Sequence, residues 1–188
     1  MVKMTFFRIV FTLGAFFVGG LCRQVHAGEN GSGYFYYGIG TGADLPGSQW
    51  NADDYVGAGA QVLGGYQVDP NWAGQLDVQE WIFAGGGNSL YNLRVLAEAK
   101  YTFEGQGPSS ASGPGWQPYL LAGPGMVFQS LSPSGDSTAN FDVLGGVGIQ
   151  ADLAPRTRWF LQAEANFIVS QTTTFTDVPI STGLWVEF

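Results

Sequence analysis

Residues 91–103 read YNLRVLAEAKYTF, and this stretch decides the fold class. Its odd-numbered positions are all apolar or aromatic, whereas its even-numbered positions include Arg94, Glu98 and Lys100. Alternation with a period of two residues is typical of a β-strand with two unlike faces. If the apolar face points inward, the strand belongs to a soluble sandwich or a lipocalin-like barrel. If it points outward, the surrounding medium must be lipid.

The same alternation recurs along the rest of the chain. The segments between the alternating stretches are rich in Gly, Pro, Ser, Asn and Asp, as at 69–71, 104–115 and 132–138, and such residues favour turns. No segment beyond the N-terminal region shows helical periodicity, so we expect one antiparallel up-and-down sheet in one domain. The expected strands are 33–41, 55–67, 72–84, 91–103, 116–129, 139–151, 158–170 and 179–188.

Three features favour lipid as the medium outside this sheet. Charged residues make up 12% of the chain, about half of the ~25% usual in soluble domains, while aromatic residues reach 15%. The apolar faces carry aromatic rings near the strand ends and aliphatic side chains between them, and no residue that we assign to these faces is charged. Ten residues rise ~33 Å, which a tilt of ~40° reduces to ~25 Å, the height of an outer-membrane apolar band.

A sheet in hydrocarbon must also close, because an open edge would leave backbone N–H and C=O groups unpaired. The sequence therefore predicts an all-β fold, an eight-stranded antiparallel up-and-down transmembrane β-barrel over residues 28–188. Eight strands place both termini on the periplasmic side.

Residues 1–27 are expected to be a cleaved signal peptide that directs the protein to the bacterial outer membrane. Lys3 and Arg8 precede an apolar run at 9–21, and Val25 and Ala27 stand at the positions that signal peptidase requires to be small. The run of about 13 residues is short of the ~20 that span a membrane. Cys22 leaves a lipoprotein signal as the alternative, although Leu21 precedes it where Gly or Ala is expected.

Removal of residues 1–27 leaves a chain with little catalytic chemistry. Cys22 and His26 are the only cysteine and histidine, and the remaining 161 residues carry 15 acidic and four basic side chains. This acidity argues against a nucleic-acid partner, whose phosphates require Lys and Arg. The lack of thiols and imidazoles argues against a transition-metal site and against a hydroxyl nucleophile with a histidine base. We therefore expect no enzyme activity, no cofactor and no metal.

The polar faces instead predict an interior network. Asp77, Arg94, Glu98, Lys100 and Glu164 fall on the same faces as many glutamines and glycines. Asp77, Glu98 and Glu164 could in principle provide an acidic catalytic pair. Beside Arg94 and Lys100 in a narrow bore, however, they are more simply read as a salt-bridged plug, because buried charges need partners.

A second acidic group is expected in the first extracellular loop. Asp44, Asp53 and Asp54 fall there, and they are read as a solvated acidic loop, with a divalent cation site as the alternative.

Several stretches resemble a known family. GGYQVDPNWAGQLDVQEW at 64–81, LRVLAEAKYTF at 93–103 and WQPYLLAGPG at 116–125 are similar to the small bacterial outer-membrane barrels that include the OmpA transmembrane domain, OmpX and OmpW. The resemblance covers essentially all of 28–188 and implies a partnership with outer-membrane lipid and lipopolysaccharide, and a monomer. The alternating ending Leu184, Val186 and Phe188 resembles the signal that the barrel-assembly machinery reads in this family, by strand addition. The sequence departs from the OmpA pattern at Phe188, so we expect no counterpart of the periplasmic domain of OmpA.

Two functions fit this expectation. The first is a structural or surface-interaction protein with a plugged barrel, whose loops 42–54, 85–90, 130–138 and 171–178 face the cell exterior. The second is a narrow OmpW-like channel for ions or small apolar solutes, in which the glycines of 55–67, 116–129 and 139–151 leave a lumen along one wall.

Overall fold

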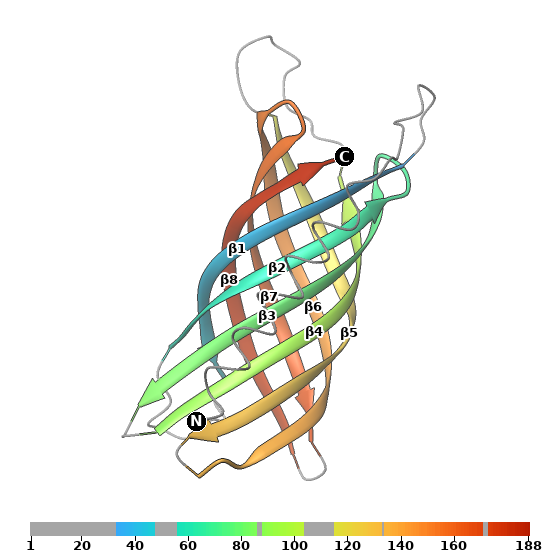
Figure 1. Cartoon of the computed structure of the whole chain (residues 1–188). Coiled ribbons are helices and arrows are strands. Elements are labelled where there is room, and N and C mark those ends of the chain that lie inside the picture. Colours follow the sequence, from blue (N-terminus) through green and yellow to red (C-terminus); the bar gives the residue numbers. More distant parts are fainter. Residues whose placement is uncertain (1–32, 48–55, 86–87, 104–114, 133, 171–172) are drawn as a thin grey trace.

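The computed structural model describes residues 33–47, 56–85, 88–103, 115–132, 134–170 and 173–188. In this part of the chain eight strands form one closed barrel in the order of the sequence (Figure 1). No helix among these residues is long and apolar enough to cross a membrane. The strands are β1 (Tyr34–Pro46), β2 (Gly57–Gln67), β3 (Trp72–Gly85), β4 (Asn88–Thr102), β5 (Trp116–Ser132), β6 (Ser137–Ala154), β7 (Thr157–Val169) and β8 (Thr174–Glu187).

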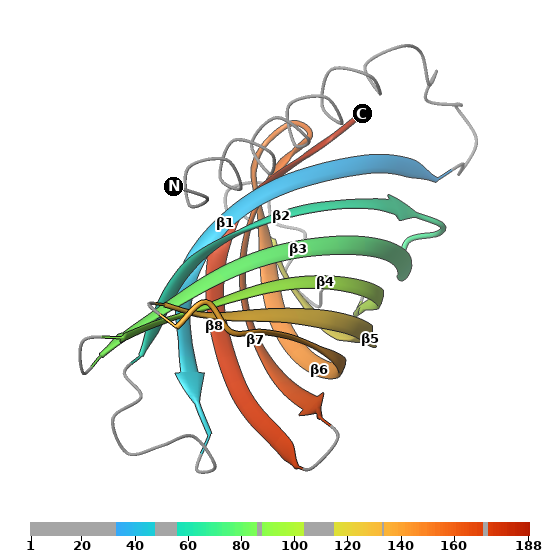
Figure 2. The same ribbon diagram turned by 60° about the horizontal axis from the view of Figure 1, so that its bottom comes forward.

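The barrel closes through the pairing of its first and last strands. β1 and β8 are antiparallel from Tyr36 opposite Glu187 to Pro46 opposite Asp177. Beyond this ladder, the backbone N–H of Phe188 donates to the carbonyl oxygen of Phe35 at 2.9 Å. Figure 2 shows the strands strongly tilted around the barrel. The predicted all-β, eight-stranded antiparallel barrel is therefore confirmed.

Several strands are longer than the sequence predicts, and β1 and β8 extend furthest into the expected loops. β1 continues to Pro46 and β8 begins at Thr174, whereas we expected 42–54 and 171–178 to be loops. Gly42 and Pro179 are strand breakers in isolation, but both continue the alternation of their strands and find partners in the β1–β8 ladder. Tertiary pairing thus overrides local propensity at the edge where the barrel closes.

The outer face of the barrel is apolar and carries aromatic rings at both ends. At the end where β1 begins and β8 ends, here called the terminal rim, ring centroids lie 4.8 to 5.6 Å apart in successive pairs. At the other end, here called the opposite rim, exposed phenylalanines occupy β5, β6 and β7. Such girdles are typical of rings resting at two membrane interfaces. The terminal-rim pairs are Phe35–Tyr66, Tyr37–Phe188, Trp72–Tyr101, Tyr101–Phe103 and Trp116–Trp159; the opposite-rim rings are Phe128, Phe141 and Phe167.

The outer face does contain one charged side chain that the sequence analysis did not assign to it. Glu80 lies between the buried residues Gln79 and Trp81 on β3 and therefore points outward. It stands opposite Ala60 on β2 and Leu93 on β4. Because β3 continues past Glu80 to Gly85 at the opposite rim, this carboxylate lies toward one end of the apolar band.

We predict that Leu76→Arg destabilises the barrel by about 2–4 kcal/mol, because a cation at the midplane of the lipid-facing wall must leave water. Leu76 is 56% exposed on the outer face and lies four residues from Trp72 in the terminal-rim girdle. The measurement is urea unfolding of the protein folded in phospholipid vesicles, followed by tryptophan fluorescence.

Leu153→Arg is the matched control. Leu153 is 60% exposed but lies at the end of β6, beside the turn to β7, where an arginine reaches water and we expect a cost of about 0–1 kcal/mol. Equal costs for the two variants would contradict a hydrocarbon environment around Leu76.

Candidate functional site: the barrel interior

The interior of the barrel is polar and strongly acidic. All five residues that the sequence assigns to the interior network point inward, together with three further carboxylic residues. Six carboxylic side chains thus share the described interior with two basic ones, and all are at most 5% exposed. The buried charged residues are Asp44, Asp77, Glu98, Asp142, Glu164 and Asp177 with Arg94 and Lys100.

Arg94 forms the centre of a layer near the opposite rim, here called the Arg94 layer. Its Nη2 atom donates to Asp44 Oδ2 at 2.9 Å and also to Asp177 Oδ2. Asn166 Nδ2 donates to the other oxygen of Asp177 at 3.0 Å. Asp142 is buried as well and adds a third nearby negative charge to the field of this guanidinium.

These contacts correct the sequence-based placement of Asp44. We expected Asp44 in an exposed loop with Asp53 and Asp54, but it lies in β1, fully buried and paired with Arg94. Asp53 and Asp54 lie outside the described residues. The alternation of β1 extends past its glycines, and this is the physical reason that Asp44 faces the lumen.

The second layer is a group of three carboxylic residues, Asp77, Glu98 and Glu164, here called the carboxyl triad. One oxygen from each side chain lies within 4.8 Å of the others. Neither basic residue of the described interior forms an ion pair with these three carboxylates. Their hydrogen-bond donors are instead the side-chain amides of glutamines. The predicted salt-bridged plug is therefore wrong for this layer, since both ion pairs of Arg94 go to other residues.

Three glutamines donate to the triad. Gln79 Nε2 donates to Asp77 Oδ2 and to Glu164 Oε2, at 3.0 Å in each case. Gln162 Nε2 donates to Glu164 Oε1 at 2.6 Å, and Gln75 Nε2 donates to Glu98 Oε2. Asp77 Oδ1 and Glu98 Oε1 are buried without a hydrogen-bond partner among the described residues.

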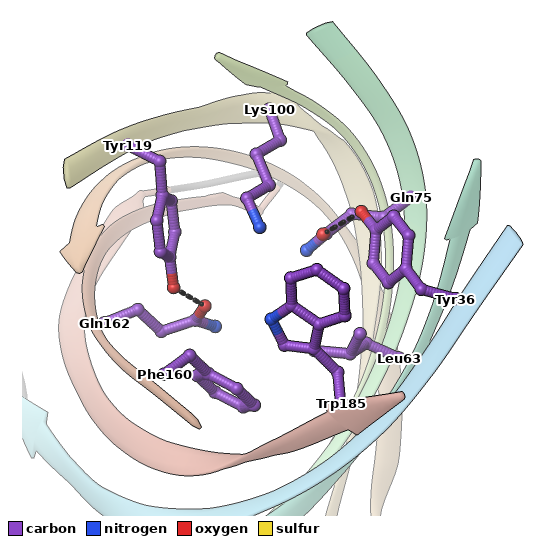
Figure 3. Close-up of a pocket in the computed structure, with 8 residues that line it drawn as sticks. All are labelled: Tyr36, Leu63, Gln75, Lys100, Tyr119, Phe160, Gln162 and Trp185. Atoms are coloured by element: carbon purple, nitrogen blue, oxygen red, sulfur yellow. Dashed lines mark hydrogen bonds between the residues drawn. The ribbon is translucent and has the colours of Figure 1, made fainter. Parts of the chain in front are cut away.

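Lys100 lies in a third layer near the terminal rim, enclosed by aromatic rings (Figure 3). Its ammonium lies 4.4 Å from the ring centroid of Tyr119, 5.1 Å from that of Trp185 and 5.6 Å from that of Tyr36. It donates one hydrogen bond, of 2.7 Å, to Gln150 Oε1. Cation–π contact and one amide oxygen thus replace the carboxylate partner that the sequence predicts.

The interior glycines do not leave an open wall. A Cβ atom on Gly59 would lie 2.5 Å from Trp81 Cε3, and one on Gly65 would lie 2.5 Å from Tyr36 Cζ. Each glycine makes room for a ring on a neighbouring strand, a pairing known to stabilise sheets. Between the Lys100 layer and the triad a cavity of about 10 Å³ remains, enough for about one water molecule.

The C-terminal residues lie on the outer face. Leu184 and Phe188 are exposed, and Val186 is half-buried. The ring of Phe188 stacks on Tyr37, with an interplanar angle of 17°. At the lumen mouth nearby, Arg158 pairs with Asp152 at 2.5 Å and with Glu187 at 3.3 Å.

Sequence reasoning missed one charged residue of the Arg94 layer outright. Asp177 stood in an expected loop, although the alternation from Phe175 to Pro179 was a signal that could have extended the last strand. It also missed the inward rings, because Trp81, Phe160 and Trp185 occupy polar-face positions and aromatic residues were sought in the girdles.

Comparison with known proteins supports the fold and no closer relationship. No protein-family model matches the sequence, and no curated protein sequence matches it either. Neisserial surface protein A has a similar structure, with a TM-score of 0.68 at 18% identity over 82% of this chain and 97% of that one. At this identity the likeness shows the fold of a small outer-membrane barrel alone.

Two further structures have the same architecture. A major outer membrane protein of Thermus thermophilus matches with a TM-score of 0.57 at 13% identity, over 84% of this chain and 100% of that one. Ail, the attachment invasion locus protein of Yersinia pestis, matches with a TM-score of 0.50 at 14% identity, over 84% and 99% of the two chains.

We predict that Arg94→Met destabilises the protein by about 3–5 kcal/mol, because it leaves Asp44 and Asp177 buried without a cation. Adding Asp44→Asn and Asp177→Asn should recover much of this loss, since the remaining groups are neutral amides. Urea unfolding in vesicles measures both.

Arg158→Met is the control for loss of an arginine. Its ion-pair partners are partly exposed, and methionine keeps an apolar contact with the ring of Trp185, over which Arg158 lies, so we expect a cost below about 1 kcal/mol. A similar cost for the two single variants would refute the assignment of the Arg94 pairs to the stability of the interior.

Proposed function

We propose that this chain is an integral protein of the bacterial outer membrane with a closed barrel, and that its role is structural or surface-interacting rather than catalytic. The observation that carries this proposal is the filled lumen. Three successive layers of side chains occupy it, and a cavity beside Lys100 has room for about one water molecule. A passive pore needs a continuous water-filled path, so these layers favour a closed barrel over a channel.

The absence of histidine and cysteine from residues 28–188 supports a non-catalytic role. The carboxyl triad could serve acid–base chemistry only on a substrate that reaches it. Its three side chains are at most 5% exposed. They lie between the Arg94 layer, toward the opposite rim, and the Lys100 layer, toward the terminal rim. Such deep burial gives a substrate little access and therefore supports a non-catalytic role.

The surface that would meet a partner is acidic or neutral. With both termini in the periplasm, the opposite rim faces the cell exterior. The four basic residues of 28–188 lie elsewhere: Arg94 and Lys100 are in the lumen, Arg156 is in the turn between β6 and β7, and Arg158 is at the start of β7. Ail has been solved in complex with the heparin analogue sucrose octasulfate, but this chain offers no cation at its outer rim for such a polyanion. We propose instead that the carboxylates of this rim bind lipopolysaccharide phosphates through bridging divalent cations.

The closed sheet and its last strand bear on the oligomeric state and on assembly into the membrane. Every strand in the described barrel has two neighbours, so no edge is left for a second copy, and we propose a monomer. The outward-facing ending Leu184, Val186 and Phe188, of which Leu184 and Phe188 are exposed, supports recognition of the last strand by the barrel-assembly machinery before β1 pairs with it.

We predict that the refolded protein is silent in planar lipid bilayers. The double variant Arg94→Ala, Tyr119→Ala removes one large side chain from each of two layers, and it should show openings under the same conditions. Steady openings of the unmodified protein would favour the channel and contradict the closed barrel. In that case Gly146→Ala would test where ions pass, because its added Cβ would lie 3.0 Å from Glu164 Cγ. Loss of the openings in this variant would place the conducting path beside Gly146.

We predict that Phe188→Ala lowers the amount of protein in the outer membrane of cells but leaves refolding into detergent nearly unchanged. The backbone bond of residue 188 to Phe35 survives this substitution, so the loss falls on recognition. Phe141→Ala removes an equally exposed ring from the outer face of β6 and is the control. Equal membrane levels for the two variants would rule out a recognition role for Phe188.

A further inference from the structure

The charge balance of the lumen is uneven along its axis. Along β4, Glu98 lies between Arg94 and Lys100, so the carboxyl triad is enclosed between the two cationic layers. Yet the ion pairs of Arg94 go to Asp44 and Asp177, and the one hydrogen bond of Lys100 goes to Gln150. The triad therefore has three carboxylic groups in a buried space with no cation bonded to them in the described structure. Removing such charges from water without a counter-charge costs several kcal/mol per ion.

The spacing of the triad oxygens is compatible with a calcium-sized ion. One oxygen from each of Asp77, Glu98 and Glu164 lies within 4.8 Å of the other two. Calcium binds oxygen at 2.3–2.6 Å, so two of its ligands can lie up to about 5 Å apart, which covers all separations within this bound. Zinc and copper prefer nitrogen or sulfur, which this layer does not offer.

Two carboxylate oxygens of the triad are available to bind a ligand. Asp77 Oδ1 and Glu98 Oε1 are buried and accept no hydrogen bond, although the other oxygen of each carboxylate does.

Gln61 is a separate observation. Its side chain is 2% exposed, and neither its amide nitrogen nor its amide oxygen has a partner among the described residues. It stands directly opposite Gln79, whose amide bridges Asp77 and Glu164. Buried side-chain amides are rarely left unpaired, and an amide oxygen is a usual calcium ligand.

We propose that Asp77, Glu98 and Glu164 bind one divalent cation of the size of calcium in the centre of the lumen, with Gln61 supplying a further oxygen. Gln75, Gln79 and Gln162 hold the carboxylates in place through their amide donors. Because the layers above and below seal this space, the ion enters as the barrel folds and is held thereafter. The proposal does not depend on whether the barrel conducts.

The test is refolding from urea into detergent micelles in the presence of calcium chloride or of the chelator EGTA. After gel filtration in metal-free buffer, elemental analysis should find one calcium per chain in the first sample. The thermal midpoint should be higher with calcium than with EGTA by about 5 °C or more, as expected for a ligand bound only by the folded state. A protein that retains no calcium and unfolds at the same temperature in both buffers overturns the proposal.

Isosteric variants locate the ion. Glu98→Gln and Glu164→Gln keep the volume of the triad but remove one charge, so each should lose the retained calcium and the calcium-dependent shift. Glu80→Gln removes a carboxylate from the outer face of β3 and should behave as the unmodified protein does. Asp53→Asn, Asp54→Asn tests the acidic loop in the same way. Loss of calcium from either control, or retention by both triad variants, overturns the assignment.

Discussion

The constraint on which this structure depends is that a backbone surrounded by hydrocarbon must pair all of its own polar groups. The ladder between β1 and β8 meets it by removing the last open edge of the sheet. Closure has a second consequence, because it divides the side chains into an outer set that contacts lipid and an inner set that contacts only itself. Every polar residue on the inner set must then find its partner within one narrow space.

The interior satisfies that requirement unevenly. Near the opposite rim two carboxylates share one guanidinium, and near the terminal rim one ammonium is enclosed by three rings. Between these layers amides, rather than cations, contact the carboxyl triad. Side chains from neighbouring strands cover the interior glycines, with aromatic rings at Gly59, Gly65 and Gly148 and with Leu96 and Glu164 at Gly125 and Gly146. The filled interior is the basis for the proposed structural role.

The outer face is simpler because its side chains contact hydrocarbon and need no polar partners. Apolar side chains suffice, with rings at the two interfaces. Glu80 is the exception in the described strands, and its position toward the opposite rim lets its carboxylate approach the interface. The short side chain of Ala60 on the neighbouring strand leaves room for it to do so.

The fold class follows from the sequence alone, since an alternation of period two identifies each strand and assigns each residue to one of two faces. The same alternation places Asp77, Arg94, Glu98, Lys100 and Glu164 on the inner face. Which of these residues meet depends on the folded barrel. Arg94 pairs with Asp44 and Asp177, which are 50 and 83 residues away along the chain, because partners across a lumen depend on the stagger of all eight strands and on closure. Local pattern contains neither quantity, so it could predict a polar interior but not its pairs.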